Sequence, residues 1–207
     1  MMSRRIMSPA RFATDEDGAT MVEFAVVLAI FLLLVFGLID FGRLGFSYVM
    51  AEKATERAAR IAVVNAPVCT GLADVTTRGV GGMSSLIPNG TSCGAGSAIC
   101  STIATVTCRG TSGNATAARI WSQVQPLLPV NATPENLEFA YSFDPALNRL
   151  GAPYAPIVSV DIVDLQFQFI SPLGAFAAMA GATQASDLGA TVTFPSMSAS
   201  LPSEDLR

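Results

Sequence analysis

The sequence predicts an α+β fold in which a long N-terminal transmembrane helix continues into a small, mostly antiparallel β-sheet domain. Two patterns predict it. An apolar run near the N-terminus passes into an apolar stripe of helical period, and short segments of alternating apolar and polar residues follow further along the chain. The composition agrees, because 51% of the residues are hydrophobic and 14% are charged, the reverse of the balance in a disordered chain.

The transmembrane part of this helix is predicted over residues 19–39, a run of 21 residues with one charge, Glu23. At about 1.5 Å per residue the run is roughly 30 Å long, the thickness of the hydrocarbon core of a bilayer. A cleaved signal peptide is the competing interpretation, because arginines precede the run. The run is longer than the roughly 7 to 15 apolar residues of a signal peptide, and residues 39–43 contain no small-x-small cleavage site. We therefore expect a single membrane span.

Beyond the span, the helical pattern continues to about residue 64. Asn65-Ala66-Pro67 then ends the helix, because a proline disfavours helical backbone in the residue before it. The whole helix, residues 19–64, contains 46 residues and is expected to be about 69 Å long. Apolar residues recur there at steps of three or four: Phe41, Leu44, Tyr48, Ala51, Ala54, Ala58 and Ile61. The outer half, residues 40–64, is expected to present its small-residue stripe, Ala51, Ala54, Ala58 and Ala62, to a folded domain.

All four cysteines lie in a Gly- and Ser-rich stretch, residues 65–120. They are separated by 23, 6 and 7 intervening residues, so the close pairs that are typical of a zinc site are missing, and we expect no metal. Two disulfides formed in an oxidising compartment are the favoured interpretation, and free buried thiols are the alternative. Four cysteines allow three pairings, and the sequence does not choose among them. The residues are Cys69, Cys93, Cys100 and Cys108.

Short alternating segments predict about four strands after the helix. Three lie at residues 102–108, 137–143 and 158–162, and the alternation continues over 165–169 with a shift of one residue. That shift predicts a β-bulge near Val163-Asp164. The last strand, residues 190–201, is interrupted by Pro195 and is expected at a sheet edge. One further helix is predicted over residues 115–125.

The composition argues against several classes of function. The chain has no His, one Lys and a net charge of −4. Without a basic patch it is not expected to bind nucleic acid, and without His it lacks the commonest general base. Asp161 and Asp164 are the one close acidic pair in a strand context, but no third ligand or partner base accompanies them, so a solvated sheet face explains them better. We expect no enzymatic activity and no cofactor.

Three motifs occur in order along the first sixty residues: DGATMVEFA at residues 17–25, FGLIDFGR at residues 36–43 and ATERAAR at residues 54–60. Together they resemble the TadE-like family, the pseudopilins of tight-adherence (Flp-type) pilus systems, which have a type IV prepilin-like N-terminus. The chain departs from the family pattern in two places. Ala29 stands where the family usually has Pro, and the third motif has no Gly.

The resemblance implies a processing site between Gly18 and Ala19. A prepilin peptidase would remove residues 1–18, a cytoplasmic leader, and residues 65–207 would form a pilin-like periplasmic domain. The α-amine of Ala19 exposed by cleavage would pair with Glu23 of a neighbouring subunit, because two charges that are costly in lipid become tolerable when paired. The implied partners are other pilin or pseudopilin subunits, an assembly platform in the inner membrane, and the lipid bilayer.

The function that this resemblance implies is that of a minor pilin-like structural protein in the assembly of a tight-adherence type IVb surface pilus. It would sit in the bacterial inner membrane with its N-terminus in the cytoplasm. The alternative from another class is an unprocessed single-pass scaffold or receptor with a periplasmic binding domain. A third possibility is an enzyme that uses Asp161 and Asp164.

Overall fold

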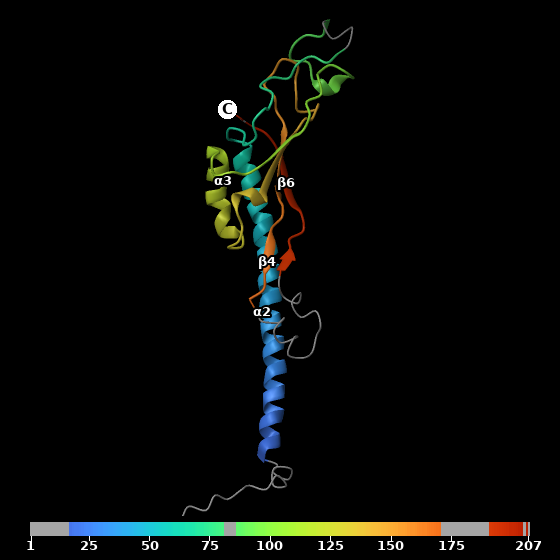
Figure 1. The fold of residues 1–207 in the computed structure, drawn as a ribbon. Coiled ribbons are helices and arrows are strands. Elements are labelled where there is room, and N and C mark those ends of the chain that lie inside the picture. Colours follow the sequence, from blue (N-terminus) through green and yellow to red (C-terminus); the bar gives the residue numbers. More distant parts are fainter. Residues whose placement is uncertain (1–16, 81–85, 171–190, 205, 207) are drawn as a thin grey trace, which may run out of the picture. The chain divides into compact units, whose positions relative to one another are not determined.

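The computed structural model describes residues 17–80, 86–170, 191–204 and 206 (Figure 1). Most of the leader predicted at residues 1–18 therefore lies outside the described residues. The predicted α+β class is confirmed, because one long apolar helix is followed by an antiparallel sheet. The chain divides into two units: residues 1–43 with 169–190, and residues 44–168 with 191–207.

The long helix α2 (Asp17–Ala62) contains 46 residues, as many as the sequence predicts, and begins two residues earlier than expected. Within the described part of the chain it is the one helix long and apolar enough to cross a membrane. Its end is capped, since the Asn65 side chain donates a hydrogen bond of 2.6 Å from Nδ2 to the carbonyl of Ile61. That contact satisfies one of the carbonyl groups that a helix C-terminus leaves without a helical partner.

The second unit is built on a four-stranded antiparallel sheet of order β1-β2-β3-β6. Burial alternates along its two central strands, so every second side chain enters one core. The register places Leu137 opposite Ile162, Phe139 opposite Val160 and Tyr141 opposite Val158 on the buried face. The strands are β1 (Val106–Arg109), β2 (Leu137–Ser142), β3 (Ile157–Ile162) and β6 (Met197–Pro202).

Two helical segments complete this core: the outer part of α2, beyond Leu44, and α3 (Ala115–Val124). Figure 1 shows α3 beside the outer part of α2, and Arg57 Nη2 donates to Gln123 Oε1 at 2.9 Å between them. The small-residue stripe of α2 is fully buried, with 0% exposure at Ala51, Ala54, Ala58, Ala59 and Ala62. Small side chains on this face let the neighbouring elements approach the helix backbone closely.

The helix α3 confirms the prediction over residues 115–125. Its N-cap is Asn114, whose side-chain oxygen accepts a hydrogen bond of 2.9 Å from the backbone N–H of Ala117. Three single turns of 3-10 helix complete the helical elements described: η2 (Cys93–Ala95), η3 (Gln125–Leu127) and η4 (Pro134–Asn136).

The β-bulge predicted near Val163-Asp164 is wrong. The chain instead leaves the four-stranded sheet after Ile162, passes through a left-handed residue at Asp164 (φ 55°), and enters a second sheet. That sheet pairs β4 (Gln166–Gln168) with β5 (Thr191–Thr193). A strand that changes sheets shifts the side-chain alternation by one residue, just as a bulge does, so the pattern alone does not separate the two.

The single last strand predicted over residues 190–201 is two strands that belong to different sheets. β5 pairs with β4, whereas β6 lies at the edge of the four-stranded sheet beside β3. Pro195 stands between them, at the interruption that the sequence predicts. The strand predicted over residues 102–108 is shorter than expected and begins at Val106.

Candidate functional site

The predicted processing motif lies at the start of α2. Gly18 and Ala19 fall in its first turn, and Ala19 and Glu23 are exposed. Because helical residues four positions apart share a face, Ala19 and Glu23 lie on the same side of α2. Among the described residues, Glu23 has no hydrogen-bond or ion-pair partner. The fold thus presents an exposed carboxylate one helical turn beyond the predicted cleavage point.

The cysteines form two disulfides, and all four residues are used. The first joins Cys69, seven positions after the last residue of α2, to Cys108 in β1. The second joins Cys93 to Cys100 and closes a short loop within the Gly-rich stretch. Both bridges therefore fix the stretch that has few apolar side chains of its own.

The acidic pair Asp161 and Asp164 does not form a site. Asp161 stands in β3 opposite Glu138, whereas Asp164 is 70% exposed and pairs with Arg109, whose Nη2 lies 2.7 Å from Oδ2 of Asp164. The hydrogen bond that Arg109 donates to Asp164 is the main cause that raises the pKa of Arg109, and Coulombic attraction from Asp164 and Glu138 adds to it. Across the described ranges, no group of three His, Cys, Asp or Glu side chains is placed to hold a metal ion.

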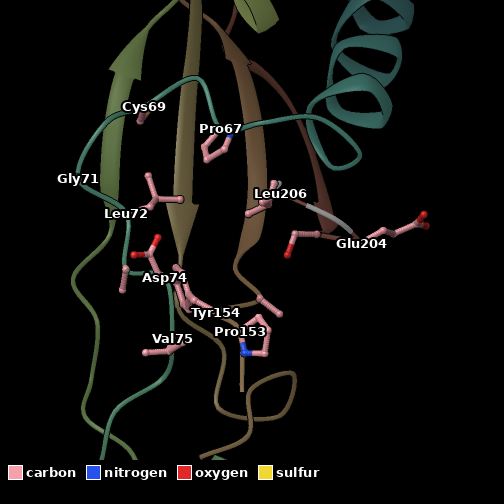
Figure 2. Close-up of a pocket in the computed structure, with 13 residues that line it drawn as sticks. Pro67, Cys69, Gly71, Leu72, Asp74, Val75, Pro153, Tyr154, Glu204 and Leu206 are labelled. Atoms are coloured by element: carbon pink, nitrogen blue, oxygen red, sulfur yellow. The ribbon is translucent and has the colours of Figure 1, made fainter. Parts of the chain in front are cut away.

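A cavity of about 670 Å³ opens between the segment that follows α2, the loop at residues 153–155 and the residues Ser203, Glu204 and Leu206 near the C-terminus (Figure 2). Among the described residues that line it, Asp74 and Glu204 are charged, and Figure 2 shows the Glu204 side chain pointing away from the other labelled residues. None of the described lining residues is a Lys or Arg, and the lining cysteine, Cys69, is in a disulfide. Among the described lining residues, the cavity therefore offers no cationic group and no free thiol.

Tyr154 is the most unusual group at this cavity. Its ring stacks on Phe143 with centroids 6.3 Å apart, and the residue is 7% exposed. Its hydroxyl is buried and has no hydrogen-bond partner among the described residues. Burial raises the pKa of Tyr154, so the phenol stays protonated to a higher pH than that of an exposed tyrosine.

Asn148 is a structural residue that sequence reasoning misses. It is 1% exposed, and all of the hydrogen-bonding capacity of its amide is used. Oδ1 accepts from Thr76 Oγ1 at 3.1 Å and from the Ala155 N–H at 2.9 Å. Nδ2 donates at 2.8 Å to the carbonyls of Asp144 and Ala155. Its polarity predicts a surface position, and its partners come from three places in the chain, so no local signal reveals it.

These features define a membrane-anchored protein: one apolar helix long enough to span a bilayer, joined to a disulfide-bonded α+β domain. Comparison with family models then gives a more specific result, because residues 18–60 match the model described as TadE-like protein. The resemblance that the three motifs indicate is thereby confirmed over that segment. The match indicates a protein associated with tight-adherence pili. Comparisons with curated proteins and with solved structures found no match.

Proposed function

We propose that this protein is a minor pilin-like structural subunit, a pseudopilin, that is processed between Gly18 and Ala19 and takes part in assembly of a tight-adherence type IVb surface pilus. The observation that carries the proposal is the position of the family match. It begins at Gly18, contains Glu23 and covers the whole apolar part of α2.

The backbone at the proposed cleavage point suits a protease. Gly18 lies in the first turn of α2, where the first N–H groups have no helical partner. Gly is also about 1 kcal/mol less favourable in a helix than Ala. Unwinding this turn into the extended form that a protease binds is therefore inexpensive, and no side chain at Gly18 obstructs the enzyme.

The proposed role of Glu23 follows from the cost of a carboxylate in lipid. Insertion scales put an acidic residue at the centre of a membrane helix at about 3 kcal/mol, and less near its ends. A cationic α-amine on Ala19 of an adjoining subunit would offset that cost once the two chains pack side by side. The pairing sets the axial position of one subunit against the next, because only one offset brings the two charges together.

The remaining parts take structural roles in this proposal. Residues 19–39 anchor the subunit in the inner membrane and then enter a bundle with other pilin or pseudopilin helices. Residues 65–207 form the periplasmic domain, and the two disulfides are consistent with an oxidising compartment on that side. Prepilin peptidase and the inner-membrane assembly platform are the partners that processing and assembly require.

Mass spectrometry of the protein extracted from membranes of pilus-forming cells tests the processing step. The expected N-terminus of the mature chain is Ala19. A chain that starts at Met1 or Met2 contradicts processing and favours the unprocessed scaffold or receptor.

Substitution of Glu23 tests the charge pairing separately. Glu23→Gln keeps the shape of the side chain and removes its charge, so we expect cleavage to proceed while pilus assembly falls about tenfold or more, the effect of losing about 1.4 kcal/mol per subunit contact. Glu23→Asp retains the charge and is the matched control, with assembly near that of the natural chain. Normal assembly by Glu23→Gln would refute the pairing.

A further inference from the structure

Phe169 and Ile170, far along the chain, contact α2 at the point where its apolar run ends. Asp40, the first residue after the run, is 2% exposed, and its Oδ1 lies 3.2 Å from Arg43 Nη1. The same oxygen accepts a hydrogen bond of 3.4 Å from the backbone N–H of Ile170, which is 130 positions away in the sequence. Beside this contact, the rings of Phe41 and Phe169 meet edge to face with centroids 6.1 Å apart.

This contact leaves large apolar side chains uncovered. Phe41 is 63% exposed and Ile170 is 74% exposed. They adjoin the end of the apolar run, where Leu38 is 77% exposed. We call Phe41, Phe169 and Ile170 the exit cluster. Its apolar surface is continuous with the surface that α2 presents over residues 19–39, and that continuity indicates which partner covers it.

We propose that the exit cluster inserts into the interfacial layer of the lipid bilayer and attaches the chain to the membrane at a second place, separate in sequence from the transmembrane helix. The proposal depends on α2 spanning the membrane and does not depend on processing or pilus assembly. The partner is the lipid surface itself, since the side chains involved are apolar and the neighbouring span is already expected to lie in lipid.

The geometry agrees with the dimensions of a bilayer. Phe41 lies two positions beyond Ile39, or about 3 Å further along the helix axis. The headgroup region adds roughly 5 to 7 Å on each side of the hydrocarbon core, so Phe41 falls within it. The contacts with Phe41 and Asp40 hold Phe169 and Ile170 at the same level. Aromatic side chains are enriched at this depth in membrane proteins.

Asp40 has a positioning role in this arrangement. A carboxylate next to lipid is costly unless it is paired and hydrogen-bonded. Arg43 supplies a cation, and the backbone of Ile170 supplies an N–H donor to the carboxylate. The contact thus lowers the cost of Asp40 and at the same time fixes Ile170 where it reaches the lipid.

Tryptophan quenching in the full-length chain tests the proposal. Trp121, the one native Trp, is replaced by Phe, and a single Trp is placed at Ile170 or, in a second variant, at Phe41. Each protein is inserted as one copy per nanodisc, with lipids brominated near the glycerol end of their acyl chains. Leu38→Trp is the control within the span, and Val64→Trp, beyond the far end of α2, is the control in water.

We expect brominated lipid to lower the emission of Trp at positions 170 and 41 about twofold or more, close to its effect at position 38, because all three lie at membrane depth. Emission at position 64 is expected to be unchanged. Quenching at positions 170 and 41 no greater than at position 64 overturns the proposal. A blue-shifted emission without quenching overturns it too, because the cluster would then be covered by protein.

A second set of variants tests the role of Asp40 in the Ile170→Trp and Phe41→Trp proteins. Asp40→Ala removes the acceptor for the Ile170 N–H, so quenching at position 170 is expected to fall while quenching at position 41 stays. Asp40→Asn keeps an oxygen acceptor and is expected to preserve quenching at both positions. Equal quenching at position 170 in all three backgrounds refutes the positioning role.

Discussion

Asn148 joins three parts of the second unit through one side chain. Its amide bonds to Thr76 in the segment after α2, to the carbonyl of Asp144, and to both backbone groups of Ala155. Hydrogen bonds in a buried site contribute modestly when they are formed, but a buried donor or acceptor left without a partner costs about 1 to 3 kcal/mol. Removing the amide leaves several buried donors and acceptors without a partner at once.

We therefore predict that Asn148→Ala lowers the free energy of unfolding of the second unit by about 3 kcal/mol or more, because several buried partners of the amide are left unsatisfied. Asn131→Ala is the matched control. It removes one hydrogen bond from an exposed side chain, to the carbonyl of Gln166, and is expected to cost about 1 kcal/mol or less. Urea titration of the detergent-solubilised protein, followed by Trp121 fluorescence, measures both. Equal costs would contradict the structural role of Asn148.

Tyr141 and Tyr154 make stability depend on pH in the alkaline range. Burial raises the pKa of both phenols, and the hydrogen bond that the Val68 N–H donates to Tyr141 offsets part of that rise. The unfolded chain releases these protons near pH 10, so the folded state keeps them at a pH where the unfolded chain has lost them. Their contribution is intact below about pH 10 and is lost as the pH rises through the folded-state pKa values.

The predicted outcome is a free energy of unfolding that falls as the pH rises above about 10 in the natural chain. In the double variant Tyr141→Phe, Tyr154→Phe the fall is expected to be smaller, since neither ring titrates. Urea midpoints at a series of pH values provide the comparison. The same decline in both proteins would assign the alkaline sensitivity to other groups.

Helix α2 is the element that the sequence predicts best, and the reason is physical. A membrane span needs a long apolar run, and a helix packed on a domain needs a stripe of period 3.6, and both are local properties of sequence. The predicted and observed ends differ by two residues. The buried alanines of its outer half also lie where the periodicity places them.

This packing predicts that α2 tolerates no large side chain on its buried stripe. Ala58 has 0% exposure, so Ala58→Leu forces atoms into filled space and is expected to lower the free energy of unfolding by about 2 kcal/mol. Glu52→Leu, on an exposed position of the same helix, is the control and is expected to change it by about 0.5 kcal/mol or less. Thermal unfolding followed by near-UV circular dichroism measures the difference. Equal effects would show that the stripe is not close-packed.

The strands show that a local sequence pattern predicts where a strand lies and does not predict which strand it pairs with. Alternation predicts β2 and β3 because each has one buried face, and that property is again local. The partner of a strand is set by residues far along the chain, so the change of sheet at Asp164 has the same sequence pattern as a bulge. For the same reason, the separation of residues 190–201 into two sheets follows from pairing and not from composition.

The candidate site likewise has one part that the sequence predicts, the processing motif, and one part that it does not, the disulfide pairing. The processing motif is a short contiguous signal, so Gly18, Ala19 and Glu23 are identifiable from sequence, although their roles stay predictions. The disulfide pairing depends on how the Gly-rich stretch folds back on itself. Gly79 shows this, since a Cβ there would clash with the carbonyl oxygen of Ala98. Only glycine therefore fits beside the β-bridge that pairs Arg78 with Cys100.

The two disulfides are expected to contribute different amounts to the free energy of unfolding of the domain. Cys69–Cys108 closes a loop with a sequence separation of 39, and it ties the chain that leaves α2 to the edge strand β1. Cys93–Cys100 closes a loop with a separation of 7. In the chain-entropy account, a bridge stabilises by restricting the unfolded chain, and the effect grows with the logarithm of loop length.

That account predicts a loss of about 4 kcal/mol in the free energy of unfolding for the double variant Cys69→Ala, Cys108→Ala, and about 2 kcal/mol for Cys93→Ala, Cys100→Ala. Urea titration of full-length protein, with Trp121 fluorescence as the signal, compares the two. Trp121 lies in α3, which follows β1 closely in the chain, so the first variant is also expected to alter the folded-state emission more. A larger loss from the short loop would contradict the entropic order. It would indicate instead that the Cys93–Cys100 disulfide holds the Gly-rich stretch in contact with other parts of the chain. One such contact is the β-bridge that pairs Ser92 with Arg149.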